Sequence, residues 1–258
     1  NITIQSKNGS ECNCINHGIY VGGTATDMTI TNVTVRDLQY GATWGVRFLK
    51  TVTNVTIDGL TVEDLGGGDS RGMQFQGVVN GLSILNAVID LDDKNSGNDG
   101  NYGIYFNTTT TGVTLDNVTV HDAEIYSLYF GGVANTPTIE NSTFDNQVGG
   151  NAYPMIRFNN TVNNLDIDNI TVNADFTGST NDHNYGIYFY GAVQTASITN
   201  SDFIEADVAG IWFNGTNKDN ITISGNTFTK NGSGADAQGG LIFTNTRNTT
   251  SDAGPVLV

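Results

Sequence analysis

A short apolar segment of the form Gly-Ile-Tyr-Phe recurs nine times along the 258 residues of the chain. In the first seven repeats an aliphatic residue lies nine positions after the last residue of this segment. A further apolar residue lies five positions after the aliphatic one. Eleven of the 12 Phe residues fall in these columns. The segments recur every 24 to 31 residues. Repeats of this length are typical of solenoid and array architectures. The nine segments end at Val21, Phe48, Phe75, Phe106, Phe130, Phe158, Phe189, Phe213 and Phe243.

Each repeat predicts three short strands separated by tight bends. The middle segment has the form Thr-Ile-x, and Thr and β-branched residues favour a pleated strand. Every repeat then places Asn or Gly before the third strand, and these two residue types tolerate the left-handed backbone conformation. The eight bend positions are Asn32, Gly59, Asn86, Asn117, Asn141, Asn169, Asn200 and Gly225.

Glycine and asparagine also recur at two other places in the repeat. A position after the first strand holds Gly or Asn in seven of nine repeats, as at Gly23 and Gly77, which predicts a further bend. Glycine at the entry to the first strand fits either the floor of a shallow groove or a backbone angle needed at the corner. These entry glycines are Gly18, Gly45, Gly72, Gly103, Gly186, Gly210 and Gly240.

Three strands and three bends in each repeat, stacked in register, describe a parallel β-solenoid. The pattern resembles the right-handed parallel β-helix of the pectate-lyase-like superfamily, with the Asn-rich short repeats of bacterial surface proteins. The resemblance implies an all-β, single-stranded right-handed parallel β-helix of about nine coils. Inward Phe and Ile columns are then expected to stack at about 4.8 Å per coil.

No linker divides the chain, so we expect a single domain over residues 1–258, with an irregular C-terminal tail over residues 244–258. Asn1–Ile4 is expected to be the middle strand of an incomplete coil, and no Thr-Ile-x-Asn segment follows Phe243. Solenoids need caps over their open ends. We therefore expect flanking domains, or copies stacked end to end, as partners.

Composition narrows the functional classes. Ten basic residues stand against 26 acidic ones, a net charge of −16, so the chain cannot build the basic footprint of a nucleic-acid-binding protein. No run of 18 apolar residues is present, which predicts no membrane span. Two Cys residues, Cys12 and Cys14, do not make a disulfide framework. Low Lys and abundant Asn and Thr favour an extracellular or cell-surface location.

The corner that leads from the third strand back to the first varies in length, and variable loops on a rigid scaffold commonly carry binding sites. Aromatic, Arg and Gln side chains fill two outward columns of the first strand beside this corner. They predict a stripe on which a glycan lies, although Tyr pairs also simply stabilise neighbouring strands. The candidate glycan-binding residues are Tyr20, Trp44, Arg47, Arg71, Gln74, Tyr102, Tyr105, Tyr126, Tyr129, Arg157, Tyr185, Tyr188 and Trp212.

The resemblance also supplies a test for catalysis. Pectin hydrolases of that superfamily carry two or three Asp on the first strand, whereas the matching positions here hold Tyr, Arg, Gln, Trp and Ile. Pectate lyases use calcium on Asp ligands and an Arg base, but the acidic cluster here begins at least one coil beyond Arg47 and Arg71. We therefore predict no catalytic residues and a non-catalytic adhesin-like or filament-building module. The alternative is a polysaccharide lyase or glycoside hydrolase acting along the same face.

Acidic residues gather at two places. The loop from Asp90 to Asn101 concentrates oxygen ligands suited to calcium, the one cofactor that the sequence suggests, although a solvated acidic loop has the same composition. After the middle strand, three acidic side chains of neighbouring coils are expected to stack and repel one another. They are Asp116, Glu140 and Asp168. The candidate calcium ligands are Asp90, Asp92, Asp93 and Asp99.

Overall fold

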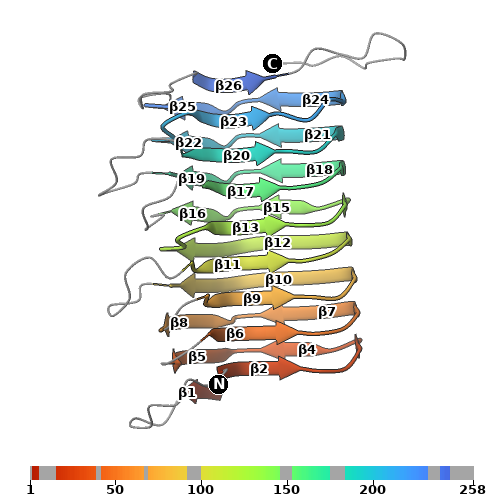
Figure 1. The fold of residues 1–258 in the computed structure, drawn as a ribbon, viewed down its shortest axis with the longest axis vertical. Coiled ribbons are helices and arrows are strands. Elements are labelled where there is room, and N and C mark those ends of the chain that lie inside the picture. Colours follow the sequence, from red (N-terminus) through yellow and green to blue (C-terminus); the bar gives the residue numbers. More distant parts are fainter. Residues whose placement is uncertain are drawn as a thin grey trace.

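The computed structural model describes residues 2–5, 16–38, 42–66, 69–91, 100–145, 153–174, 184–231 and 239–244. The regular elements of these residues are all strands, and the strand pairs are parallel. The coils stack along the long axis of the molecule, with β1 and β26 at opposite ends of the stack (Figure 1). The fold is thus the expected all-β parallel solenoid.

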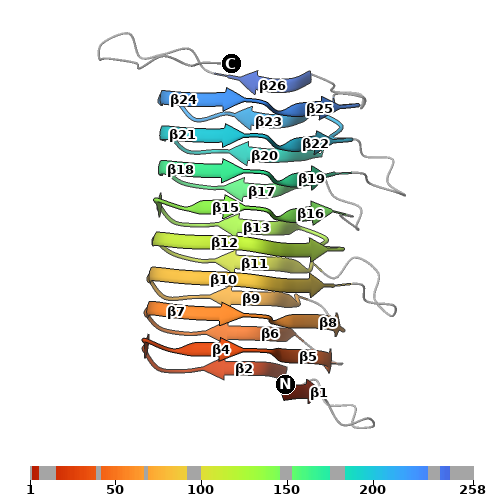
Figure 2. The ribbon, with the colours of Figure 1, turned by 180° about the vertical axis from the view of Figure 1, so that it is seen from behind.

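One face of the solenoid is a nine-stranded sheet built from the first strand of every repeat. In Figure 2 its strands run in the opposite direction to those of the other sheet. Its strands in spatial order are β2 (Asn16–Val21), β6 (Thr43–Phe48), β9 (Arg71–Phe75), β11 (Tyr102–Phe106), β13 (Tyr126–Phe130), β17 (Pro154–Phe158), β20 (Tyr185–Phe189), β23 (Ala209–Phe213) and β26 (Gly239–Phe243).

The second and third strands of the coils form a single 17-stranded sheet, because β10 (Val79–Asp90) and β12 (Thr110–His121) continue through the bend between them. The other second strands are β3 (Ala25–Thr26), β4 (Thr29–Thr31), β7 (Val52–Asp58), β14 (Ala134–Asn135), β15 (Thr138–Glu140), β18 (Val162–Asp168), β21 (Val193–Thr199) and β24 (Lys218–Ser224). The other third strands are β1 (Ile2–Gln5), β5 (Val33–Leu38), β8 (Thr61–Leu65), β16 (Thr143–Asp145), β19 (Thr171–Asn173), β22 (Asp202–Ile204) and β25 (Thr227–Thr229).

Eight coils have all three strands within the described residues, and β1 and β26 add one strand at each end. The expected count of about nine is therefore one too high for complete coils. The assignment of β1 to a middle strand is wrong, because Ile2 pairs with Val33 and Ile4 with Val35 of the third strand β5. The sequence holds the reason, since Asn-Ile-Thr-Ile matches the bend and third strand Asn-Val-Thr-Val at residues 32–35.

The core consists of the predicted ladders. Phe rings of neighbouring first strands stack nearly parallel, with centroids 4.6 to 5.2 Å apart from Phe48 to Phe243. Ile57, Ile84 and Leu115 form the aliphatic ladder of the second strands and are fully buried. Inward side chains are fixed by strand register, because a slip of one residue would turn every side chain to the other face.

Each coil has two left-handed backbone positions that are five residues apart. All eight predicted Asn or Gly positions before the third strand have left-handed φ angles between 49° and 68°. A second left-handed position, missed in the sequence, lies five residues earlier in every coil; its residues are Asp27, Asn54, Gly81, Gly112, Thr136, Asn164, Thr195 and Asn220. The chain also bends near Gly23 and Gly77, as expected, but without a left-handed φ.

Glycine at the entry to the first strand has a different cause from either interpretation of the sequence. Gly45, Gly72 and Gly103 are buried and have no left-handed φ, so they neither form a groove floor nor supply an unusual backbone angle. A Cβ at Gly103 would lie 2.3 Å from the carbonyl oxygen of Ser127 and 2.5 Å from the Val120 side chain. At these positions glycine avoids a clash, because the backbone of the next coil and the side chains of the third-strand column approach closely.

The acidic column stacks in the predicted register, with Asp116 beside Glu140 and Glu140 beside Asp168. Bend amides of the next coil donate hydrogen bonds to two of these carboxylates: Asn141 to Asp116 (2.8 Å) and Asn200 to Asp168 (2.7 Å). The Thr199 hydroxyl also bonds Asp168, and these hydrogen bonds lower the pKa of its carboxyl from the ordinary value. Hydrogen bonding therefore stabilises the charged form of two of the three stacked carboxylates, Asp116 and Asp168.

Candidate functional site

The outward face of the nine-stranded sheet carries the two predicted columns, in register from coil to coil. In the first column His17 pairs with Trp44, Trp44 with Arg71 and Arg71 with Tyr102. All 13 candidate residues belong to these columns, so the structure brings them onto one face. We call this surface the aromatic stripe; its second column holds Tyr20, Arg47, Gln74, Tyr105, Tyr129, Arg157, Tyr188, Trp212 and Ile242.

Arginine and tryptophan dominate the N-terminal part of the stripe. The Arg47 guanidinium carbon lies 4.3 Å from the centre of the Trp44 ring, and that of Arg71 lies 5.8 Å from it. The His17 ring stacks on the Trp44 ring, and their centroids are 5.0 Å apart. Arg47 Nη1 donates to His17 Nε2 (3.2 Å). Burial, and secondarily the Arg47 charge, lowers the pKa of His17, so the imidazole is neutral at pH 7.

Four tyrosines make up the middle of the stripe. Tyr105 and Tyr129 stack with centroids 4.7 Å apart, and Tyr126 stacks on Tyr129 at 4.9 Å. Tyr102 packs edge-on against Tyr105, and Arg71 lies 4.9 Å from its ring. Burial raises the pKa of Tyr102 to about 12, partly opposed by the positive charge of Arg71. Burial likewise raises the pKa of Tyr126 and Tyr129.

Arg157 links the middle of the stripe to its C-terminal part. It donates to the Tyr126 hydroxyl (2.7 Å) and to Asn159 Oδ1 (2.9 Å), and its guanidinium carbon lies 5.7 Å from the rings of both Tyr188 and Tyr190. Beyond it, Tyr185 and Tyr188 contact Trp212 at 5.1 and 5.7 Å. Ring and guanidinium contacts therefore continue without a break from His17 to Trp212.

Several buried polar atoms of the stripe have no hydrogen-bond partner in the described part of the chain. They are Trp44 Nε1, Gln74 Oε1 and the Nε atoms of Arg47, Arg71 and Arg157. Gln74 is 5% exposed and Trp44 6% exposed, so both residues are buried although they belong to the outward columns. Such groups cost stability when they remain unsatisfied, and their concentration at one place requires an explanation.

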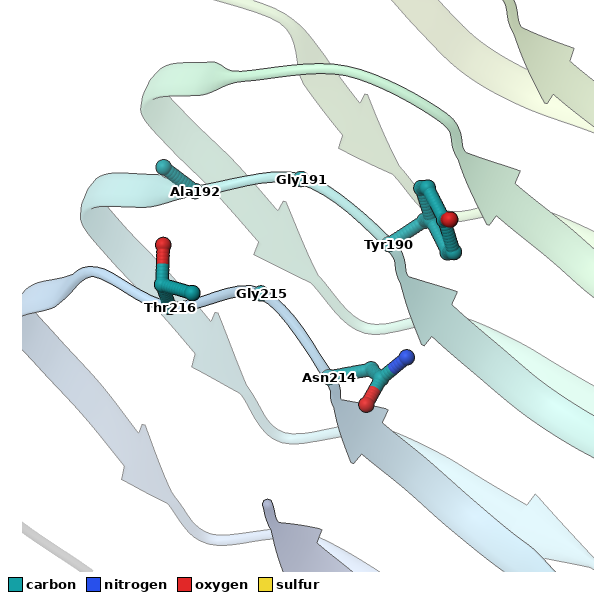
Figure 3. Close-up of a pocket in the computed structure, with 6 residues that line it drawn as sticks. All are labelled: Tyr190, Gly191, Ala192, Asn214, Gly215 and Thr216. Atoms are coloured by element: carbon teal, nitrogen blue, oxygen red, sulfur yellow. The ribbon is translucent and has the colours of Figure 1, made fainter. Parts of the chain in front are cut away.

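A hollow of about 280 Å³ opens at the C-terminal end of the stripe, where the chain leaves β20 and β23. Figure 3 shows Tyr190 and Asn214 at one side of it and the Ala192 and Thr216 side chains at the other. Asn214 Nδ2 donates to the Tyr188 hydroxyl (2.8 Å), which connects the hollow to the stripe. Tyr190 is 55% exposed.

Tyr190 and Asn214 were missed in the sequence because they follow the repeated segment rather than belong to it. Their signal is the position directly after the first strand's terminal Phe, at Phe189 and Phe213. Tyr153 was missed at the other side of the strand. It precedes Pro154 and packs edge-on against Tyr126 at 5.4 Å, where Pro154 interrupts the first column.

None of the nine first strands contains Asp or Glu, so the stripe has no carboxylate of its own within the described strands. Asp90 ends β10, while Asp92, Asp93 and Asp99 lie outside the described residues, as do Cys12 and Cys14. The described residues contain no group of three His, Cys, Asp or Glu side chains arranged for a metal ion. The calcium site stays a prediction, which a thermal melt with EDTA and then calcium tests.

Comparison with known protein families identifies the family of the chain. The model of the family described as "Right handed beta helix region" matches residues 96–252, more than half of the sequence. The chain belongs to this right-handed β-helix family. No curated protein matches this β-helix protein. In its described part, no helix is long and apolar enough to cross a membrane.

Proposed function

We propose that this β-helix protein is a non-catalytic glycan-binding module whose binding surface is the aromatic stripe. The unbroken series of ring and guanidinium contacts from His17 to Trp212 carries the proposal. Aromatic side chains offer a large apolar surface with polar tips, and Arg and Gln add hydrogen-bonding groups. A long sheet face of this composition suits a polymer that lies across several coils.

The competing explanation is that the tyrosines only stabilise the sheet. Ring stacking between neighbouring coils, as between Tyr105 and Tyr129, supports that explanation. It does not account for Tyr20 and Tyr190, which are 52% and 55% exposed. Nor does it account for unpartnered polar atoms at Trp44 and Gln74, since a purely structural ladder gains nothing from them. A ligand with many hydroxyl groups explains these observations together.

A lyase or hydrolase on the same face is the alternative. Such an enzyme needs a pair of titratable groups matched to the reaction. The first strands supply no carboxylate, and Tyr102, with a pKa of about 12, stays protonated at neutral pH and cannot act as a base there. These features support binding over catalysis. The Asn- and Thr-rich, Lys-poor composition supports an extracellular or cell-surface place for this module, in an adhesin or a filament.

A glycan array combined with an assay for newly released reducing ends tests the proposal. We expect binding without product. The Tyr105→Ala/Tyr129→Ala double variant should lose binding, whereas Thr114→Ala/Thr138→Ala, in the same two coils but on another face, should retain it. Release of product would show an enzyme instead. Equal binding by wild type and the Tyr variant would remove the stripe as the binding surface.

A further inference from the structure

We propose that Trp44, Arg47, Arg71 and Gln74 form a subsite for an oxyanion group of the bound glycan, either a carboxylate or a sulfate ester. The inference rests on the glycan-binding function proposed above and names the chemistry of the ligand. The four residues occupy two adjacent coils, with Trp44 beside Arg71 and Arg47 beside Gln74. We call this group the anion subsite.

The first argument is charge. The chain has 26 acidic residues, yet three of its five Arg residues lie on the stripe, and none of the three forms an ion pair with a described carboxylate. Elsewhere two cations do form ion pairs with carboxylates: Arg36 with Asp37 and Lys230 with Glu205. Electrostatic complementarity suits an anionic partner where a very acidic protein exposes unpaired guanidinium groups.

The second argument separates Arg47 and Arg71 from Arg157. Arg157 donates short hydrogen bonds to Tyr126 and Asn159, at 2.7 and 2.9 Å, so its guanidinium already has good partners. Within the described residues, Arg47 and Arg71 each make one hydrogen bond of 3.2 Å, Arg47 to His17 Nε2 and Arg71 to the Asp69 carbonyl oxygen. Both guanidinium groups also lie near aromatic rings, and among the described residues most of their N–H groups have no acceptor and can bind a ligand.

The third argument is the set of unpartnered buried atoms. Trp44 Nε1, Arg47 Nε and Arg71 Nε are all N–H donors, and each lacks a partner within the described residues. Three donors around one ring match an oxyanion, which accepts several hydrogen bonds and pairs with guanidinium groups in a bidentate manner. Gln74 Oε1 is the one unpartnered acceptor and suits a neighbouring sugar hydroxyl.

Binding should change the contacts of the two arginines. Their guanidinium carbons lie 4.3 and 5.8 Å from the centre of the Trp44 ring, and the three donors are buried in the ligand-free protein. An oxyanion over Trp44 draws the guanidinium groups toward itself and gives the donors a partner. This movement alters the surroundings of the indole, so Trp44 reports on its own subsite. Trp212, the only other Trp in the sequence, lies at the far end of the stripe and serves as the matched reporter.

The test titrates oligosaccharides of three kinds against two single-Trp proteins. Alginate oligosaccharides carry carboxylates, dextran sulfate oligosaccharides carry sulfate esters, and dextran oligosaccharides are neutral. We expect at least one acidic ligand to change the fluorescence of Trp212→Phe, which retains Trp44, more strongly than that of Trp44→Phe. The comparison of the two acidic ligands identifies the preferred group. Affinity should fall as salt is added, because exposed charges are screened.

Charge variants made in the Trp212→Phe protein complete the experiment. Arg47→Gln/Arg71→Gln should weaken acidic-ligand binding about tenfold or more, whereas Arg36→Gln/Lys230→Gln, which removes the same charge elsewhere, should not. Arg71→Lys keeps the charge but not the bidentate geometry and should give an intermediate loss, which keeps the test valid if the double variant fails to fold.

The outcomes separate the two proposals. Equal binding of neutral and acidic ligands would overturn the anion subsite and leave the glycan-binding function standing. Acidic binding that survives Arg47→Gln/Arg71→Gln, or that only Trp212 reports, would also overturn the subsite. Failure of the wild-type protein to bind any oligosaccharide, in this titration and on the array, would overturn both proposals.

Discussion

Asparagine at the bend between the second and third strands contributes to the fold in two ways. It adopts a left-handed φ, 54° at Asn117 and 53° at Asn169, that costs most other residues free energy. Its side-chain amide also donates to the bend residue or carboxylate of the preceding coil, as Asn117 does to Asn86 at 2.8 Å. A single residue type thus supplies both the backbone angle and a link between coils.

Replacing Asn117 separates these contributions. Asn117→Ala should lower the free energy of unfolding by about 2 kcal/mol, since both the left-handed angle and the hydrogen bond to Asn86 are lost. Asn117→Gly keeps the angle accessible and should lose only about 1 kcal/mol. Urea denaturation followed by circular dichroism measures both. Equal losses for the two variants would contradict the conformational part of the argument.

The raised pKa of Tyr102 has a consequence at alkaline pH. The folded pKa of about 12 exceeds the ordinary value of 10.0, so the folded state holds this proton more tightly than the unfolded state. The resulting stabilisation is fully present below pH 10 and is lost as the pH rises from 10 to 12. Tyr102→Phe should therefore flatten the fall in melting temperature over this range.

The Arg71 charge provides the check on that assignment. Arg71→Gln removes the positive charge that opposes burial, so Tyr102 should ionise at still higher pH. The difference in tyrosinate absorbance between proteins with and without Tyr102 gives the midpoint in each background. A lower midpoint in Arg71→Gln than in wild type would contradict the role assigned to the Arg71 charge.

At the scale of the strand and its corners, close approach of neighbouring coils governs which residues are allowed. Gly103→Ala should destabilise the protein by about 2 kcal/mol, because the new Cβ meets the backbone of Ser127 at 2.3 Å and cannot be relieved by a side-chain rotation. Gly23→Ala is the matched control. A Cβ there has no atom within 4 Å, so its effect should stay within about 0.5 kcal/mol.

The Phe ladder should respond according to position. Phe130 is 1% exposed and stacks between Phe106 and Phe158, so Phe130→Ala should cost about 3 to 5 kcal/mol. Phe243 is 39% exposed and stacks on Phe213 alone among the described residues, so Phe243→Ala should cost less than about 2 kcal/mol. Chemical denaturation measures the difference. Similar losses at both positions would mean that the ladder is not the main source of stability.

The strands and their inward or outward faces could be predicted where a column of the repeat holds one kind of residue for one physical reason. The Phe column, the Asn bends and the aromatic stripe follow directly from the repeat. The left-handed position five residues before each bend was missed because Thr136 and Thr195 occupy it alongside Asn, Asp and Gly, which hides the column. The entry glycines were noticed, but their cause lies in contacts between coils that no single repeat contains.

At the scale of the whole molecule, each coil contacts mainly its two neighbours, so stability should vary along the stack. Amide hydrogen exchange should be slowest in β11 and β13, in the middle, and faster in β2 and β26, whose residues are mostly only partly buried. Mass spectrometry of peptides from each strand checks this. Equal protection in all nine first strands would indicate that the solenoid opens only as a unit.

The chemistry of the aromatic stripe could not be derived from the sequence pattern in the way that the fold could. The resemblance to a β-helix predicted the architecture, because Phe and Asn report directly on packing and backbone angle. The stripe was predicted as a set of residues, but its chemistry depended on which Arg atoms have partners. The sequence assigns Arg47, Arg71 and Arg157 alike to the stripe, and only their contacts distinguish an arginine that holds the sheet together from two that remain available to a ligand.

The number of residues is nearly constant along two sides of each coil and varies along the third. From the terminal residue of the first strand to the apolar residue of the third, as from Phe48 to Val62, the count is 14 in seven coils and 15 in the eighth. The return to the next first strand varies from 10 to 17 residues. Foreign peptides inserted at that corner should therefore leave every ladder in register. The protein is in this sense a display scaffold, able to present up to eight independent loops along one edge at the spacing of its coils.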